Sequence, residues 1–138
     1  TFGAVRVLQQ YLPNLRKADH PSVVLFSTVA ASIGMPYHAS VAMAKGAIEG
    51  LTRSLAAEWA PQIRVNCLAL SLTDTPLASR LLETEAKRTV AAERHPLKTI
   101  GKSEDIAATV QLLLSDSAGF VTGQVWKLDG GISSVRLS

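Results

Sequence analysis

Cysteine is scarce in this sequence. Cys67 is the single cysteine among 138 residues, so an intramolecular disulfide is excluded, and such sparing use is typical of a reducing compartment. A cytoplasmic protein is therefore predicted. The three histidines, His20, His38 and His95, lie far apart and have no second cysteine to join them. This spacing predicts no zinc or other metal site.

Long hydrophobic runs and clusters of one charge are missing too. No apolar run approaches the roughly 20 residues of a membrane span. The 14 Lys and Arg residues against 11 Asp and Glu give a formal net charge of +3, but the basic residues are scattered along the chain. Nucleic-acid binding usually needs them on one element. With 47% hydrophobic and 18% charged residues, we expect a globular protein with neither a membrane nor a nucleic-acid partner.

Three glycine motifs are absent as well. The sequence contains no GxGxxG and no GxxxxGK, which excludes a phosphate-cradling loop within this chain. It also contains no GxSxG, the turn that presents the nucleophile of many serine hydrolases. These absences exclude nucleotide phosphate binding by such a loop and this type of hydrolase.

What is present is an alternation of helical and strand patterns. Apolar residues at intervals of three or four predict helices over 1–17, 38–59 and 76–93, and a further helix from Ser103. Ser103 is expected to cap that helix, with acidic residues in its first turn. Runs of apolar and β-branched residues predict strands over 23–27, 63–70 and 124–128.

Strands separated by helices predict an α/β fold with a parallel sheet and right-handed crossovers. Three strands are few for such a sheet, so further strands are expected upstream of Thr1. We therefore interpret residues 1–138 as one domain, the C-terminal part of a larger protein.

Polar side chains stand where the strands of this sheet end. Thr28 ends the first strand, and Thr73 and Thr75 follow the second. The carboxyl ends of parallel strands are where α/β sheets bind ligands. Lys45 lies early in the helix over 38–59, among alanines and glycine. The alternatives are a solvated lysine and threonines that only shape loops or cap a helix.

One side of the helix over 38–59 consists of small residues: Ala39, Ala42, Gly46, Gly50 and Ala57. A glycine inside a helix costs roughly 1 kcal/mol relative to alanine. Close packing against another helix would compensate for that cost. This side is therefore predicted to form a contact between subunits, in a homodimer or a homotetramer.

A set of short motifs in a fixed order makes the chain resemble the C-terminal half of a short-chain dehydrogenase/reductase. The motifs are Ser27-Thr28-Val29-Ala30, Ala44-Lys45-Gly46-Ala47, Leu51-Thr52-Arg53-Ser54-Leu55-Ala56-Ala57-Glu58, Arg64-Val65-Asn66, Asp74-Thr75-Pro76-Leu77, Val121-Thr122-Gly123-Gln124 and Asp129-Gly130-Gly131. The resemblance covers nearly the whole chain. It implies a Rossmann-type, doubly wound parallel sheet, of which this chain holds three strands with flanking helices.

The resemblance also implies an activity and its residues. It implies NAD or NADP as cofactor and hydride transfer to or from a carbonyl or alcohol of a small-molecule substrate. Lys45 matches the lysine that binds the nicotinamide ribose and lowers the pKa of the family's catalytic tyrosine. Thr28 matches the serine that polarises the substrate oxygen. Thr73 and Thr75 fall where contacts to the nicotinamide amide are expected, and Thr75 matches that pattern better.

The sequence departs from the family at two places. Val41 stands where the tyrosine is expected, four residues before Lys45, and Leu70-Ser71 replaces Pro-Gly. Valine has no proton to give. One alternative is an enoyl-thioester reductase that uses His38, seven residues before Lys45, or its neighbour Tyr37; both could equally be a polar junction before the helix.

A second alternative is a non-catalytic relative that binds a nucleotide or a partner through the same fold. The pyrophosphate-binding turn of the family is expected upstream. The 138-residue chain alone is therefore predicted to bind neither NAD(H) nor NADP(H) with useful affinity, and to lack activity by itself.

Overall fold

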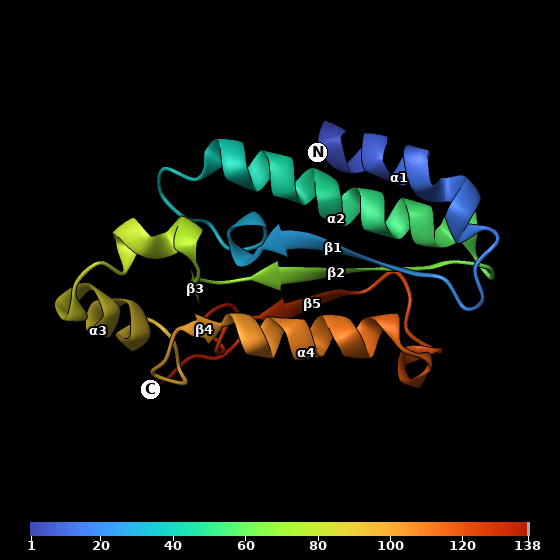
Figure 1. Cartoon of the computed structure of the whole chain (residues 1–138). Coiled ribbons are helices and arrows are strands. Elements are labelled where there is room, and N and C mark those ends of the chain that lie inside the picture. Colours follow the sequence, from blue (N-terminus) through green and yellow to red (C-terminus); the bar gives the residue numbers. More distant parts are fainter. Residues whose placement is uncertain (138) are drawn as a thin grey trace.

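The computed structural model describes residues 1–137 as an α/β fold in three layers (Figure 1). The α-helices are α1 (Phe2–Leu15), α2 (Ala39–Trp59), α3 (Glu85–Glu93) and α4 (Ser103–Leu114). The strands are β1 (Ser22–Thr28), β2 (Arg64–Leu70), β3 (Thr73–Asp74), β4 (Gly101–Lys102) and β5 (Val125–Leu128). Short 3-10 helices are η1 (Val29–Ala31), η2 (Pro76–Leu81) and η3 (Asp116–Ala118).

The main sheet has three strands in the order β1-β2-β5, and both pairings are parallel. Thr28 lies opposite Leu70, which in turn lies opposite Leu128. The carboxyl ends of all three strands therefore meet at one edge. The expected fold class, a parallel sheet of three strands flanked by helices, is confirmed.

Side chains of β1 and β2 point alternately to the two helical layers, as the pleat of a strand requires. Val65 packs with Ala56 of α2 and, through Leu12 and Leu15, with α1. On the other face, Leu68 packs with Leu113 of α4. β2 is covered on both faces and is buried from Val65 to Ala69, whereas β1 is mostly half-buried.

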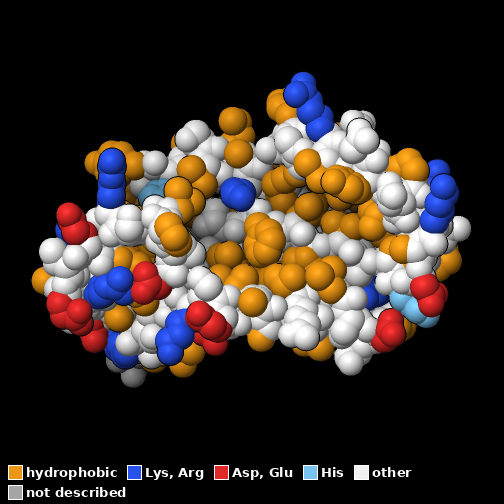
Figure 2. Space-filling view, viewed as in Figure 1, with side chains coloured by type: hydrophobic (Ala, Val, Ile, Leu, Met, Phe, Trp, Pro, Cys, Tyr) orange, Lys and Arg blue, Asp and Glu red, His pale blue; other side chains and the backbone are white. Residues whose placement is uncertain are grey.

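One edge of the sheet is open. Among residues 1–137, β1 pairs with β2 alone. Beside that edge, Figure 2 shows apolar side chains gathered between α2 and α4, and Phe26 of β1 is 42% exposed. A shallow hollow there is lined by Phe26, Ile106, Val110 and Leu114.

The prediction of one helix over 76–93 is wrong. The segment divides into η2 and α3, separated by residues 82–84. Leu82 turns into the interior, with 2% of its surface exposed, and packs with Ala78 and Ala91. The Thr84 hydroxyl then accepts a hydrogen bond from the Lys87 backbone N–H at 3.2 Å and starts a new helix.

Two further features were not expected. β3 and β4, two residues each, form a small parallel pair beside the main sheet. The N-cap of α4 is Lys102, so the prediction of Ser103 as the cap is wrong. The Ser103 hydroxyl instead donates to the backbone oxygen of Asp74, at 3.2 Å.

Within residues 1–137, no helix combines the length and hydropathy needed to cross a membrane. In the same range, no three His, Cys, Asp or Glu side chains gather as a metal would require.

Candidate active site

Lys45 lies on α2 and reaches toward the edge strand β1. Its side chain is half-buried, and its Nζ donates to the backbone oxygen of Phe26 at 2.9 Å. An ammonium group has three donors. Since this is the one side-chain bond of Lys45 within residues 1–137, two donors remain for a ligand at the carboxyl end of β1.

Thr28 stands at that same end, at the N-cap of η1. Its Oγ1 donates to the backbone oxygen of Leu70 at 3.1 Å and accepts from the N–H of Ala30 at 3.4 Å. The hydroxyl proton is therefore held by the neighbouring strand. To polarise a substrate oxygen, the hydroxyl has to turn away from Leu70.

The three candidate residues before Lys45 differ in their exposure to solvent. Val41, one helical turn earlier, is 44% exposed, whereas Tyr37 is fully exposed and has a φ of 63°. His38 is half-buried at the N-cap of α2, and its Nδ1 lies 2.7 Å from the backbone oxygen of Pro36. Because a carbonyl only accepts, Nδ1 carries a proton, and Nε2 of the neutral ring is an acceptor.

The structure separates the two threonines after β2. Thr73 is 8% exposed, and its hydroxyl donates to the backbone oxygen of Ser71 at 3.1 Å. It lines a cleft of about 210 Å³ together with His95. Thr75, the N-cap of η2, lines a different and more open hollow of about 510 Å³. Its hydroxyl has no hydrogen-bond partner within residues 1–137.

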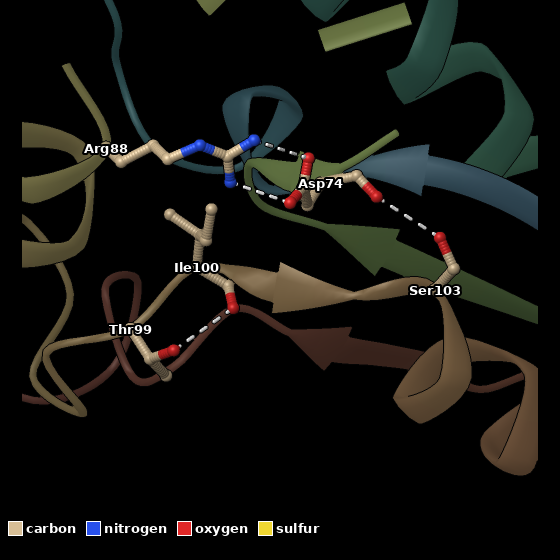
Figure 3. Close-up of polar contacts among 5 residues, drawn as sticks. All are labelled: Asp74, Arg88, Thr99, Ile100 and Ser103. Atoms are coloured by element: carbon tan, nitrogen blue, oxygen red, sulfur yellow. Dashed lines mark hydrogen bonds and ion pairs between the residues drawn. The ribbon is translucent and has the colours of Figure 1, made fainter. Parts of the chain in front are cut away.

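An ion pair borders the second hollow (Figure 3). Arg88 of α3 donates from Nη1 to Oδ2 of Asp74 at 2.7 Å and from Nη2 to Oδ1 at 3.4 Å. This hydrogen bond holds the pKa of the Asp74 carboxyl below its usual value. Together with the Ser103 bond to the Asp74 backbone, it ties β3 to α3 and α4. Sequence reasoning missed this contact, because residues 14 positions apart carry no local signal of pairing.

Sequence reasoning also missed a buried pair at the end of β2. Ser71 Oγ lies 2.8 Å from Nε2 of His95, which is 3% exposed. The one signal in the sequence was a serine at the position where the family pattern has glycine.

Comparison with known proteins assigns this arrangement to a family. Residues 1–133 match the family profile described as enoyl-(acyl carrier protein) reductase. The chain is 36% identical over 131 residues to the 3-oxoacyl-[acyl-carrier-protein] reductase FabG of Thermotoga maritima, covering 94% of this chain and 52% of that protein.

Two solved structures resemble it closely. Ligand-free aldohexose dehydrogenase of Thermoplasma acidophilum has a TM-score of 0.91 at 32% identity, over 99% of this chain and 58% of that one. Gluconate 5-dehydrogenase of Burkholderia cenocepacia, in complex with NADP and tartrate, has a TM-score of 0.88 at 27% identity, over 97% and 53%.

A parallel α/β sheet with a lysine and threonines at its carboxyl edge, matched to oxidoreductases, defines the class. The chain belongs to the short-chain dehydrogenase/reductase family. It spans about half the length of the curated relatives it matches.

Proposed function

We propose that this chain forms the nicotinamide and substrate side of an oxidoreductase that uses NAD or NADP. The whole protein would transfer hydride to or from a carbonyl or alcohol of a small molecule. The observation that carries the proposal is Lys45, whose ammonium makes one hydrogen bond within residues 1–137 and keeps two donors for a ligand at the carboxyl end of β1. In parallel α/β sheets, ligands bind outside this edge.

The residues at this edge fit one end of a dinucleotide. Two free ammonium donors of Lys45 suit the paired hydroxyls of a ribose. The hydroxyl of Thr75, which has no partner within residues 1–137, suits a carboxamide better than that of Thr73, which is buried and already donates to Ser71. A pyrophosphate-binding glycine turn is absent from this sequence and would have to be supplied by another part of the whole protein.

When bound, a nicotinamide cofactor supplies or accepts the hydride. The chain's own residues orient the partners and manage charge on the substrate oxygen. Lys45 fixes the ribose, and its positive charge favours negative charge that develops nearby. Thr28 can donate a hydrogen bond to the substrate oxygen once its hydroxyl leaves the Leu70 carbonyl.

Val41 cannot serve as the proton donor of this site, because valine has no acidic proton. His38 could donate from Nε2 only in its charged form, because its Nδ1 proton is directed at Pro36. A charged imidazole donates from both of its ring nitrogens. An enoyl-thioester reductase that uses His38, or Tyr37 after a change in its exposed position, is therefore the variant of this function that we retain.

A non-catalytic relative is the second candidate. Two observations favour it: Val41 presents an alkyl group where an acid is needed, and the Thr28 hydroxyl is held by Leu70. Such a protein would bind the dinucleotide or a partner without turning over a substrate.

Substitution of Val41 separates these functions. In the whole protein, Val41→Tyr places a phenol one helical turn before Lys45, on the same face. General acid catalysis is typically worth about 10²- to 10⁴-fold, so carbonyl reduction with NADH or NADPH should rise at least about tenfold. Val90→Tyr, the same change at an exposed position of α3, is the control and should leave the rate unchanged.

The remaining variants test the other two candidates. If His38 or Tyr37 is the acid, His38→Ala or Tyr37→Phe abolishes turnover of an enoyl-thioester substrate and Val41→Tyr does little. If neither the unmodified whole protein nor any of the three variants turns over carbonyl or enoyl substrates, the oxidoreductase proposal is wrong and the non-catalytic one stands.

A further inference from the structure

Ser71, the first residue after β2, is held from three directions. Its backbone N–H donates to Leu128 of β5 at 3.2 Å. Its backbone oxygen accepts from the Thr73 hydroxyl at 3.1 Å. Its own hydroxyl lies 2.8 Å from Nε2 of His95. The residue that begins the segment toward Thr73 and Thr75 is therefore fixed by main-chain and side-chain bonds together.

The partners of His95 determine which ring nitrogen carries the proton. His95 Nδ1 lies 2.9 Å from the backbone oxygen of Ala91. Because that oxygen only accepts, Nδ1 donates, and Nε2 of the neutral ring is the acceptor for the Ser71 hydroxyl. Both nitrogens are thus satisfied in a ring that is 3% exposed, as buried polar groups need to be.

The His95 ring also touches the turn after β5. Gly130 has a φ of 58°, and a Cβ added to it would lie 3.2 Å from His95 Cβ and 3.4 Å from Cδ2. Next to the ring, the Leu97 N–H donates to the Gly130 oxygen at 3.1 Å. Hydrogen bonds of the imidazole thus link the end of β2 to α3, and the turn after β5 packs beside the His95 side chain.

We propose that Ser71 and His95 act as a positioning pair, which holds the segment of Thr73 and Thr75 against the carboxyl edge of the sheet. A glycine at position 71 has no hydroxyl to make this bond. The proposal rests on the proposed function for its consequence, which is the affinity for the nicotinamide cofactor. Neither residue is assigned a contact with substrate or cofactor.

Removal of the Ser71 hydroxyl tests whether its hydrogen bond with His95 holds the segment in place. In the whole protein, Ser71→Ala should raise the Kd for NADH or NADPH about fivefold, the change that loss of one hydrogen bond of ordinary strength produces. Hydrogen exchange in the peptide that contains residues 71–75 should accelerate by a similar factor. Ser71→Thr keeps the hydroxyl and should restore both values. Ser54→Ala, at an exposed position of α2, is the matched control and should change neither.

A double substitution tests whether the two residues act as one unit. His95→Phe keeps a ring but removes both nitrogens, so it should match or exceed Ser71→Ala. If the pair is real, adding Ser71→Ala to His95→Phe changes nothing further. The proposal is overturned if exchange is unchanged in Ser71→Ala, or if the two effects simply multiply.

Hydrogen exchange tests the positioning pair independently of cofactor binding. If the unmodified whole protein binds neither NADH nor NADPH, the proposed function is wrong, and the exchange measurements alone decide whether Ser71 and His95 position the segment.

Discussion

Replacement of Asn66 should destabilise this fold more than its position on a strand would indicate. Asn66 is fully buried, with 0% of its surface exposed. Its Nδ2 donates to the backbone oxygen of Val121 at 2.9 Å, and its Oδ1 accepts from the N–H of Gln124 at 3.1 Å. Next to it, the Cys67 N–H donates to the Gln124 oxygen at 2.9 Å and begins the pairing of β2 with β5. The side chain therefore holds the segment that leads into β5.

Asn66→Ala leaves the Val121 oxygen and the Gln124 N–H, which lie in partly buried hydrogen bonds, without this partner. Each such group costs about 1–3 kcal/mol. The Val121 oxygen retains a long bond of 3.5 Å from Arg64, so its share lies at the lower end. The expected loss in the free energy of unfolding is about 2–4 kcal/mol, a large part of the roughly 5–15 kcal/mol typical of a domain.

Asn66→Asp separates the two bonds. Its carboxylate can still accept from Gln124 but faces the Val121 oxygen with a second acceptor. At pH 7 this variant should be less stable than Asn66→Ala. Burial raises the pKa of such a carboxyl in the folded state above its unfolded value of about 3.9. Stability is therefore recovered as the pH falls through that raised value, where the protonated oxygen can donate to Val121.

Urea unfolding followed by tryptophan fluorescence measures these changes, since Trp59 and Trp126 are both partly buried. Asn14→Ala, the same change at an exposed position of α1, is the control and should stay within about 0.5 kcal/mol of the unmodified chain. A loss below about 1 kcal/mol for Asn66→Ala, or an Asn66→Asp variant that follows Asn66→Ala at every pH, would refute the reasoning.

Three further expectations concern single residues. Burial raises the pKa of the Cys67 thiol to about 11, although a hydrogen bond with the Thr52 side chain opposes part of this effect. A maleimide at pH 8 should therefore label Cys67 only as fast as the chain unfolds. Rapid labelling of the folded chain would contradict this expectation. Hydrogen bonds from Ser133 and from the Gly131 and Ser133 N–H groups outweigh burial and hold the pKa of Asp129 below its usual value. The stability that Asp129→Asn removes should therefore be present above about pH 4 and vanish as the pH falls through that lower pKa. If the unmodified chain and Asp129→Asn differ in urea midpoint by the same amount at pH 7 and pH 3, this expectation is wrong. A Cβ added at Gly50 meets no atom within 4 Å in one subunit, so the Gly50→Leu variant should fold normally. It should nevertheless split an oligomer formed through the side of α2 that consists of small residues. An unchanged mass in sedimentation would refute that contact.

The sequence by itself determined the main sheet and its helices. Residues 23–26 are apolar on both faces and the strand around Val65 is largely apolar, and helices pack on both faces of the sheet in the structure. Such periodicity can be read locally because it reports which side of each element is buried. The family resemblance implied that Lys45 and Thr28 serve one site, and in the structure Lys45 reaches β1 at Phe26. The catalytic roles assigned to these residues stay predictions.

Only the tertiary structure decided how the segment after β2 is built. The turn at Leu82 breaks the helical pattern over 76–93, because burial of that side chain against Ala78 and Ala91 outweighs continuation of a helix. β3 and β4 are too short to leave a periodic signal.

The side-chain partners in this region were equally hidden. Ser71 meets His95 across 24 positions, and Asp74 meets Arg88 across 14. Hydrogen bonds between residues so far apart depend on how the chain returns on itself, and a pattern of neighbouring residue types contains no information about that return. The strands and helices could therefore be predicted from local periodicity, whereas the contacts that shape the loops of the site were set by tertiary packing.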